Sequence, residues 1–323
     1  MLEFSTFALF TFIILFIEIL YLRIAKYYHI TDHPNERSSH HSITIRGGGI
    51  IFPITILLVI LFSGFKYPYF SIGLFLISFI SFWDDLHNIS NKIRIVIHLA
   101  AVSLVFLELG FYDYSFWIVI GGYVVVIGII NAYNFMDGIN GMTGLYSLTT
   151  VMTLLVLNRS MNFIENQFLV YTSVSLLVFL YFNYRKKAKC FAGDVGSVSM
   201  AFIILFALIL LINQTHQPLY LLFLALYGID TVFTIIFRLI NNENIFKAHR
   251  SHVYQLLSNE RGFSHLKVSF FYALIQSVIN CLVIYCVNRN LSEWFNIVFA
   301  FIILLSLGIV YLLIKKKDNL IYS

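Results

Sequence analysis

Charged side chains are scarce in this sequence. Asp, Glu, Lys and Arg make up 11% of its 323 residues, whereas a typical soluble domain has about 25%. Hydrophobic residues make up 59%. A soluble chain of this length needs far more polar surface, so the composition excludes a soluble globular protein and predicts that lipid surrounds most of the chain.

Cysteines, targeting signals and soluble segments are also few or missing. The three cysteines, Cys190, Cys281 and Cys286, show neither metal-ligand nor redox spacing, so we interpret them as packing residues. The N-terminal apolar run begins with acidic Glu3 and has no basic n-region or small-residue cleavage site, which predicts a retained span. The formal charge of +5 has no aromatic-interleaved soluble surface to carry it, so no nucleic acid is expected as a partner.

No internal repeat is visible, and we predict a single transmembrane catalytic domain, residues 1–323, with an active site formed by cytoplasmic loops.

Apolar segments that could cross a membrane recur along the chain, since a spanning helix needs about 20 largely apolar residues. The predicted fold class is all-α, a polytopic integral membrane bundle of about 11 transmembrane helices. The candidate spans are 4–22, 48–65, 67–83, 95–111, 115–132, 142–157, 167–184, 197–212, 218–239, 267–287 and 293–314.

The 21 Lys and Arg residues divide unequally between the two faces that these spans define. Lys66, Arg159 and Arg289 fall on one face, and the other 18 fall on the opposite face. Because cytoplasmic loops carry the excess of Lys and Arg, this division predicts a periplasmic N-terminus and a cytoplasmic C-terminus. The predicted cytoplasmic loops are 23–47, 84–94, 133–141, 185–196 and 240–266.

The first cytoplasmic loop combines arginine, imidazole and glycine. It reads Asp-His-Pro-Asn-Glu-Arg-Ser-Ser-His-His from Asp32 to His41, and Arg46 then precedes glycines 47–49. Guanidinium groups, imidazoles and free glycine N–H groups would suit a phosphate or pyrophosphate. A basic juxtamembrane loop that only fixes topology is the alternative.

The second loop opens with two adjacent carboxylates, Asp84 and Asp85, followed by Lys92 and Arg94. Adjacent carboxylates at a membrane boundary repel each other and are costly unless a metal ion or another cation compensates them. A hydrated helix end is the alternative interpretation.

The third and fourth loops place amide and carboxylate oxygens beside glycines. The third reads Asn-Ala-Tyr-Asn-Phe-Met-Asp-Gly-Ile-Asn-Gly from Asn131 to Gly141, and the fourth reads Phe-Ala-Gly-Asp-Val-Gly-Ser from Phe191. Such hard oxygen ligands suit Mg²⁺, which binds through one or two carboxylates plus substrate phosphates. Asparagine and glycine as plain turn formers are the alternative.

The fifth loop carries a His-Arg-Ser-His run from His249 to His252. Histidine with arginine can stabilise charge on a transferring phosphoryl group. A zinc site is a weaker interpretation, because no cysteine or second histidine pair stands at zinc spacing. Within the spans, Glu18, His98 and Asp230 are ionisable, and we interpret them as members of structural polar networks, with a catalytic role as the alternative.

Taken together and in chain order, these motifs resemble those of the polyprenyl-phosphate N-acetylhexosamine-1-phosphate transferase family, glycosyltransferase family 4. The resemblance covers residues 32–255 and includes Pro-Asn-x-Arg-Ser-x-His, Arg-Gly-Gly-Gly, the aspartate pair, Asn-x-x-Asn-x-x-Asp-Gly-x-x-Gly, Phe-x-Gly-Asp-x-Gly-Ser and the final histidine motif. It implies an enzyme of the bacterial cytoplasmic (inner) membrane. The phosphate of undecaprenyl phosphate would attack the β-phosphate of a UDP-amino sugar, giving a lipid-linked sugar diphosphate and UMP with Mg²⁺, or Mn²⁺ in its place.

The resemblance also implies residue roles. Asn134 and Asp194 look like the metal ligands, and Phe191 would stack on uracil while Asn140 contacts it. The other implied residues are the catalytic Asp84, Asp85, Asp137, His249 and His252 and the substrate-binding Asn35, Arg37, His40, Arg46, Arg94 and Arg250.

The final motif lacks the run of consecutive histidines found in the peptidoglycan branch of the family. It looks more like the branch that starts O-antigen, and hence lipopolysaccharide, or capsule chains, some of whose members transfer 6-deoxy amino sugars. An N-acetylhexosamine and its 6-deoxy form therefore both remain open, and we expect the sugar to be recognised by loop 240–266. Also open are a homodimer, and direct attack versus a covalent aspartyl intermediate. The alternative functions are a membrane cation transporter and a lipid-phosphate hydrolase.

Overall fold

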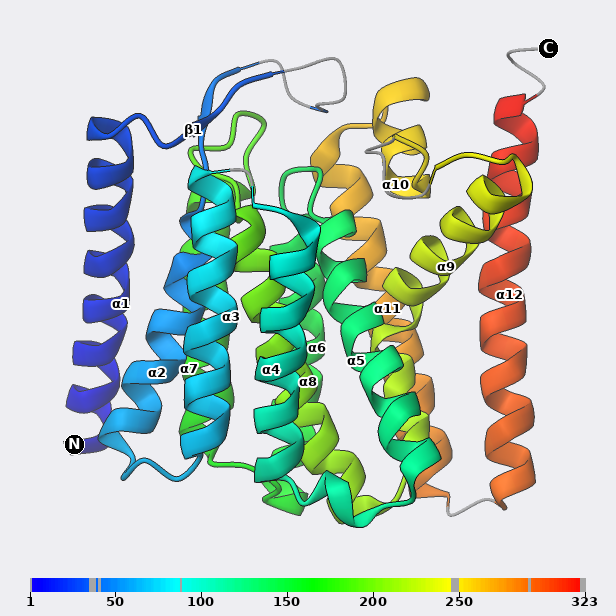
Figure 1. Cartoon of the computed structure of the whole chain (residues 1–323), viewed down its shortest axis with the longest axis horizontal. Helices are drawn as coiled ribbons and strands as arrows, with labels where there is room; N and C mark the ends of the chain where they lie inside the picture. Colours follow the sequence, from blue (N-terminus) through cyan, green and yellow to red (C-terminus); the bar gives the residue numbers. More distant parts are fainter. Residues whose placement is uncertain are drawn as a thin grey trace.

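Helices that stand side by side in one bundle make up most of the molecule (Figure 1). The computed structural model describes residues 2–34, 39, 42–87, 89–244, 250–289 and 292–319. Its elements are α1 (Leu2–Tyr27), β1 (Thr31–Asp32), β2 (Thr44–Ile45), η1 (Gly48–Ile50), α2 (Ile51–Phe62), α3 (Pro68–Leu86), α4 (Asn91–Glu108), η2 (Phe111–Asp113), α5 (Phe116–Met136), α6 (Met142–Met161), α7 (Asn166–Asn183), α8 (Gly193–Thr215), η3 (Pro218–Leu224), α9 (Ala225–Ile240), α10 (Val253–Gln255), η4 (Leu256–Glu260), α11 (His265–Asn288) and α12 (Glu293–Asn319).

The predicted fold class is confirmed, because the described chain is an all-α polytopic membrane protein with a single two-stranded ribbon, β1 antiparallel to β2. Seven helical segments in the described residues are long and apolar enough to cross a membrane, namely Ser5–Tyr27, Pro68–Leu86, Phe116–Met136, Gly193–Thr215, Pro218–Ile240, His265–Asn288 and Glu293–Lys316. Helices α2, α4, α6 and α7 occupy the other four predicted spans. The count of eleven spans and the direction of the chain across the membrane stay predictions.

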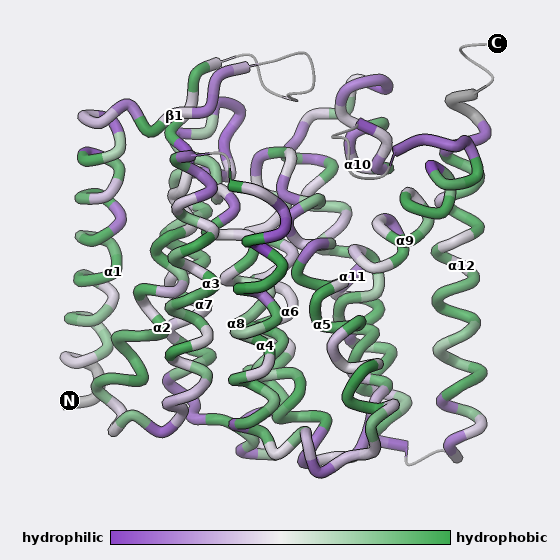
Figure 2. The backbone as a smooth tube through the Cα atoms, viewed as in Figure 1, coloured by the Kyte–Doolittle hydropathy of each residue, from purple (hydrophilic) through white to green (hydrophobic). Residues whose placement is uncertain are grey.

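Polar segments gather at one end of the bundle. The loops after α1, α3, α5, α7 and α9 and the end of α12 all lie at the upper edge in Figure 1, whereas the N-terminus lies at the lower edge. Hydrophobic positions fill the middle of the bundle, and hydrophilic positions crowd the upper edge (Figure 2). The predicted gathering of the five polar loops on one face is therefore found in the fold.

Helix α8 forms the centre of the bundle and packs against α2, α3, α5 and α6. Its most apolar stretch is 89% buried, as expected for a helix that is hydrophobic all round. The hydroxyl groups of Ser78 and Ser199 lie 2.9 Å apart and join α3 to α8, in the manner of small polar residues at membrane helix contacts. At its polar end, α8 approaches η1 so closely that a Cβ atom on Gly49 would lie 2.3 Å from the Cα atom of Gly196.

Candidate active site

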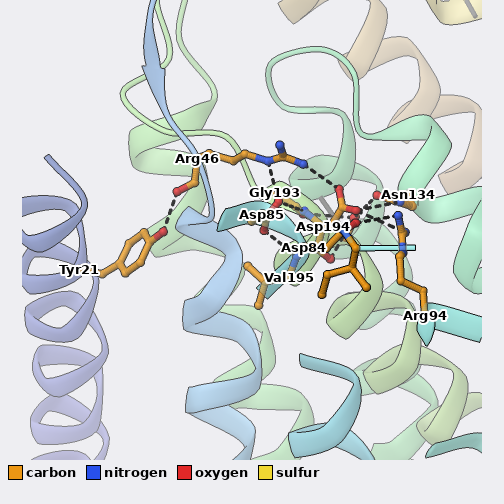
Figure 3. A network of polar contacts seen from close by, with 11 residues as sticks. Tyr21, Arg46, Asp84, Asp85, Arg94, Asn134, Gly193, Asp194 and Val195 are labelled. Atoms are coloured by element: carbon orange, nitrogen blue, oxygen red, sulfur yellow. Dashed lines mark hydrogen bonds and ion pairs between the residues drawn. The ribbon is translucent and has the colours of Figure 1, made fainter. Parts of the chain in front are cut away.

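A network of paired charges lies where the C-terminal end of α3, the N-terminal end of α8, the C-terminal end of α5 and the segment before η1 meet (Figure 3). Helix α3 ends in Asp84 and Asp85, while α8 begins with Gly193 and Asp194. The helix ends bring these carboxylates together although about 110 residues of chain separate them.

Asp85 caps the N-terminus of α8. Its carboxylate accepts hydrogen bonds from the N–H groups of Asp194 (2.9 Å) and Val195 (3.0 Å) and pairs with Arg46 Nε at 2.6 Å. The side chain is fully buried, and the helix N-terminus favours a negative charge there. Gly193 adopts a φ of 73°, and a Cβ atom on it would lie 2.5 Å from Asp85 Oδ2. Only glycine therefore lets this carboxylate reach the helix end.

Two arginines reach the carboxylate of Asp194 from opposite sides (Figure 3). Arg46 Nη2 lies 3.2 Å from Oδ1, and Arg94 Nη2 lies 3.3 Å from Oδ2. Each arginine also pairs with one member of the aspartate pair. Arg46 pairs with Asp85, and Arg94 Nη1 lies 2.7 Å from Asp84 Oδ2. Burial alone would lower the pKa of Arg46, but Asp85 and Asp194 raise it above its ordinary value, so this guanidinium stays charged.

Asn134, on the last turn of α5, joins the network from a third side. In the amide orientation that satisfies all its partners, Nδ2 donates to Ser197 Oγ (3.0 Å) and Asp194 Oδ1 (3.3 Å), and Oδ1 accepts from Arg94 Nη2 (3.1 Å). Asp194 is thus contacted from α4, α5 and the segment before η1.

A cavity of ≈ 240 Å³ opens beside this network. Six residues with sequence-predicted roles line it together, namely Arg46, Asn134, Asp137, Asn140, Phe191 and Asp194. The carboxyl group of Asp137 accepts a hydrogen bond from Thr143 Oγ1 (2.6 Å). Burial raises the pKa of Asp137 to about 7, and the nearby Asp194 charge adds to the rise against the opposing effect of Thr143.

Comparison with known proteins finds a similarity to one family. Residues 67–212, which include the aspartate pair and the third and fourth loops, match the family model of glycosyl transferase family 4. Over this segment the chain is similar to members of glycosyl transferase family 4. It is 26% identical over 314 residues to the probable undecaprenyl-phosphate N-acetylglucosaminyl 1-phosphate transferase of Bacillus subtilis, an alignment that covers 89% of this chain and 85% of that protein. This similarity and the seven apolar helices together show that the chain is a multi-pass protein of the bacterial cytoplasmic membrane.

Two features predicted for phosphate binding, the glycine triplet and His252, have other roles in the structure. The N–H groups of Gly48 and Gly49 donate to the carbonyl groups of Phe191 (2.8 Å) and Ala192 (3.0 Å). The prediction that the glycine triplet offers free N–H groups to a phosphate is therefore wrong for these two residues. The glycines instead fasten the first loop to the fourth.

His252 is buried away from the cavity lining. Its Nδ1 lies 3.1 Å from Asp230 Oδ1, and Asp230 also accepts hydrogen bonds from Val253 N (3.1 Å) and the hydroxyl group of Tyr272 (2.7 Å). Asp230 is thus part of the polar network expected for it. Arg250 is partly buried and is not among the cavity-lining residues. The predicted site residues Asn35, Arg37, His40 and His249 lie outside the described residues.

Several lining residues had no role assigned from the sequence, namely Asp32, Ser39, Gly138, Ile139, Asn183, Gly193, Gln255 and His265. Most belong to loops already expected on this face, so sidedness was a usable signal. Asn183 gave no such signal, because it ends an apolar helix. It donates from Nδ2 to Cys190 O (2.9 Å) and accepts at Oδ1 from Gly141 N (2.6 Å), which joins the third and fourth loops.

Proposed function

We propose that this protein transfers a sugar-1-phosphate from a UDP-amino sugar to undecaprenyl phosphate, releasing UMP and starting a lipid-linked cell-surface glycan. The observation that carries this proposal is the position of Asp194, held between two arginines on the wall of a cavity that also contains Phe191 and Asn140. The family and the name of the Bacillus subtilis relative support the same activity.

The donor would lie in the cavity with its diphosphate toward the two arginines. Guanidinium groups bind phosphate oxygens in pairs and are suited to this task. Phe191 offers a ring on which uracil would stack, and its backbone is fixed on both sides, since its N–H group donates to Ile45 O (2.8 Å) and its carbonyl group accepts from Gly48 N. Asn140 donates from Nδ2 to Arg185 O (2.8 Å), which leaves its amide oxygen for the base.

The charge of the network supports a need for a cation. The three carboxyl groups of Asp84, Asp85 and Asp194 face the two guanidiniums of Arg46 and Arg94, so the network offers no net positive charge to an anionic donor. A divalent cation would reverse that balance and neutralise charge that develops on the transferred phosphoryl group.

Asp194 and Asn134 fit Mg²⁺ because both line the cavity and carry the carboxylate and amide oxygens that Mg²⁺ prefers. Asn134 would turn its amide oxygen from Arg94 toward the ion when it binds. In the described residues no group of three or more His, Cys, Asp and Glu side chains forms a cage for a metal. Mg²⁺ keeps several waters and completes its shell with substrate phosphates, so two protein ligands are enough. We propose Mg²⁺ as the cofactor, with Mn²⁺ able to replace it.

The acceptor phosphate would approach the aspartate pair from the lipid side of α3. A phosphate monoester titrates near pH 6 and is largely dianionic at neutral pH, so the transfer needs positioning more than proton removal. Both aspartates are already paired, Asp85 with Arg46 and Asp84 with Arg94. We propose that they orient the arginines toward the two phosphate groups.

Release of UMP tests the proposed function. We expect purified protein in detergent, given undecaprenyl phosphate, Mg²⁺ and a panel of UDP-N-acetylhexosamines and their 6-deoxy forms, to release UMP with at least one donor. Mass spectrometry of the lipid product identifies the sugar. If folded protein releases no UMP with any donor, the proposal fails, and release of inorganic phosphate instead would favour a lipid-phosphate hydrolase.

The rate should depend on pH through Asp137. Because the pKa of this carboxyl group is raised to about 7, the ionised form is lost as the pH falls below 7. If the anion serves the reaction, kcat/KM for the UDP-sugar should fall by up to about tenfold per pH unit below 7. The donor is the substrate to vary, because the acceptor phosphate itself titrates near pH 6.

Asp137→Asn provides the control for this pH dependence. It should lower activity and flatten the limb centred near pH 7, since asparagine does not titrate. An unchanged limb in Asp137→Asn would assign the titration to another group.

A further inference from the structure

The loop between α7 and α8 carries four cations within five residues. We call residues 185–189, with Arg185, Lys186, Lys187 and Lys189, the basic loop. Lys186, Lys187 and Lys189 are exposed. In the described part of the chain no carboxylate forms an ion pair with any of the four, whereas Arg46 and Arg94 are paired with aspartates. The positive charge of the basic loop is therefore not compensated by an ion pair among the described residues.

Hydrogen bonds hold the basic loop in one shape. The N–H group of Lys189 donates to Phe182 O (2.9 Å), which closes the loop on itself. Arg185 Nε donates to Tyr181 O (2.6 Å), and its guanidinium carbon lies 4.6 Å from the centre of the Tyr181 ring. The carbonyl group of Arg185 accepts from Asn140. A ligand of the loop would therefore lose little affinity to ordering of the backbone.

An apolar stripe on α7 runs up to the basic loop. Leu177 is 55% exposed and Tyr181 is 62% exposed, and residues four apart lie one above the other on a helix face. Aromatic side chains such as Tyr181 mark the level of the lipid headgroups in membrane proteins. Exposed cations thus stand directly beyond a lipid-facing stripe at the end of the same helix.

We propose that the basic loop and the Leu177–Tyr181 stripe bind an anionic phospholipid. The phosphate would lie on Lys186, Lys187 and Lys189, and an acyl chain would follow α7. A cluster of Lys and Arg next to a membrane span attracts anionic lipids strongly. The occupant is distinct from the acceptor lipid proposed above, because the acceptor phosphate is placed at the aspartate pair, whose ion pairs are with Arg46 and Arg94 and not with the basic loop. The proposal does not depend on sugar transfer.

The test compares lipid affinity in the full-length protein. Native mass spectrometry in detergent, with added phosphatidylglycerol or phosphatidylcholine, measures binding of each lipid. The variant Lys186→Gln/Lys187→Gln/Lys189→Gln should lose affinity for phosphatidylglycerol by about tenfold to 100-fold, with no change for phosphatidylcholine. The substituted side chains are exposed, so the protein should remain folded.

A matched control removes the same charge from scattered sites. Lys26, Lys92 and Lys267 are exposed lysines on the same predicted face, and Lys26→Gln/Lys92→Gln/Lys267→Gln should stay within about twofold of the unchanged protein. Equal losses in both variants would reduce the effect to net charge and overturn the proposal, as would full retention in the basic-loop variant. Displacement of phosphatidylglycerol by inorganic phosphate or UDP would also overturn it, because the loop would then be a site for soluble anions. UMP release is measured separately, so failure of either proposal leaves the other standing.

Discussion

Replacing Asp194 by asparagine is expected to lower the rate of UMP release by about 10²–10³-fold, the usual effect of removing a group that stabilises charge in a transition state. Asp194 is the point at which Arg46, Arg94 and Asn134 meet on the cavity wall. Asparagine keeps the shape of the side chain but removes the charge on which both arginines and a Mg²⁺ ion would depend.

The fold should survive Asp194→Asn. Arg46 keeps its pair with Asp85, and Arg94 keeps its pair with Asp84, so neither guanidinium is left alone. Melting temperature in detergent checks this point, and Asp113→Asn, at an exposed position in η2, is the matched control. A folded Asp194→Asn protein that keeps more than a tenth of the activity would contradict a direct role for this carboxylate.

Replacing Gly49 by alanine is expected to damage both stability and activity. The added Cβ atom would lie 2.3 Å from the Cα atom of Gly196 and 2.9 Å from the carbonyl oxygen of Ala192. These contacts are with backbone, so η1 and α8 must separate. Overpacking of this kind costs about 1–3 kcal/mol, and a displacement of about 1 Å at a reacting group can cost about 10²-fold in rate.

Gly128→Ala, in α5, separates this steric effect from the general effect of losing a glycine. A Cβ atom there meets nothing within 4 Å, and alanine is the better helix former. We expect unchanged activity and an unchanged or higher melting temperature. If Gly49→Ala behaves like Gly128→Ala, the close approach of η1 and α8 does not constrain the site.

The sequence predicts much of this molecule because a membrane restricts what a chain can do. The length of the apolar segments located the helices, since about 20 residues suit a spanning helix whereas the strands of a closed barrel need only about 10. Alternation of spans then placed distant loops on one face, which is why Asn134, Asn140 and Asp194 were expected near one another. The 3-10 segment η3 before α9 was not expected, and the predicted span 218–239 changes direction there (Figure 1).

Individual partners were beyond prediction because they depend on contacts between elements. Nothing near Gly48 in the sequence indicates that its N–H group is taken by Phe191. In the same way, His252 belongs to a motif that suggests phosphate chemistry, but in the structure it contacts Asp230 in a buried network. Asp230 lies on α9, which follows the 3-10 segment η3. Charge pairing between Arg46 and Asp194 likewise spans 148 residues.

The burial of α8 sets a limit on how the site can respond to substrate. A segment enclosed on all sides by other helices opens only at a free energy close to that of global unfolding, whereas peripheral segments open far more readily. Asp194 begins this helix and moves with it. Substrates must therefore enter and products leave while Asp194 stays in place, and any rearrangement during turnover belongs to the segments around it.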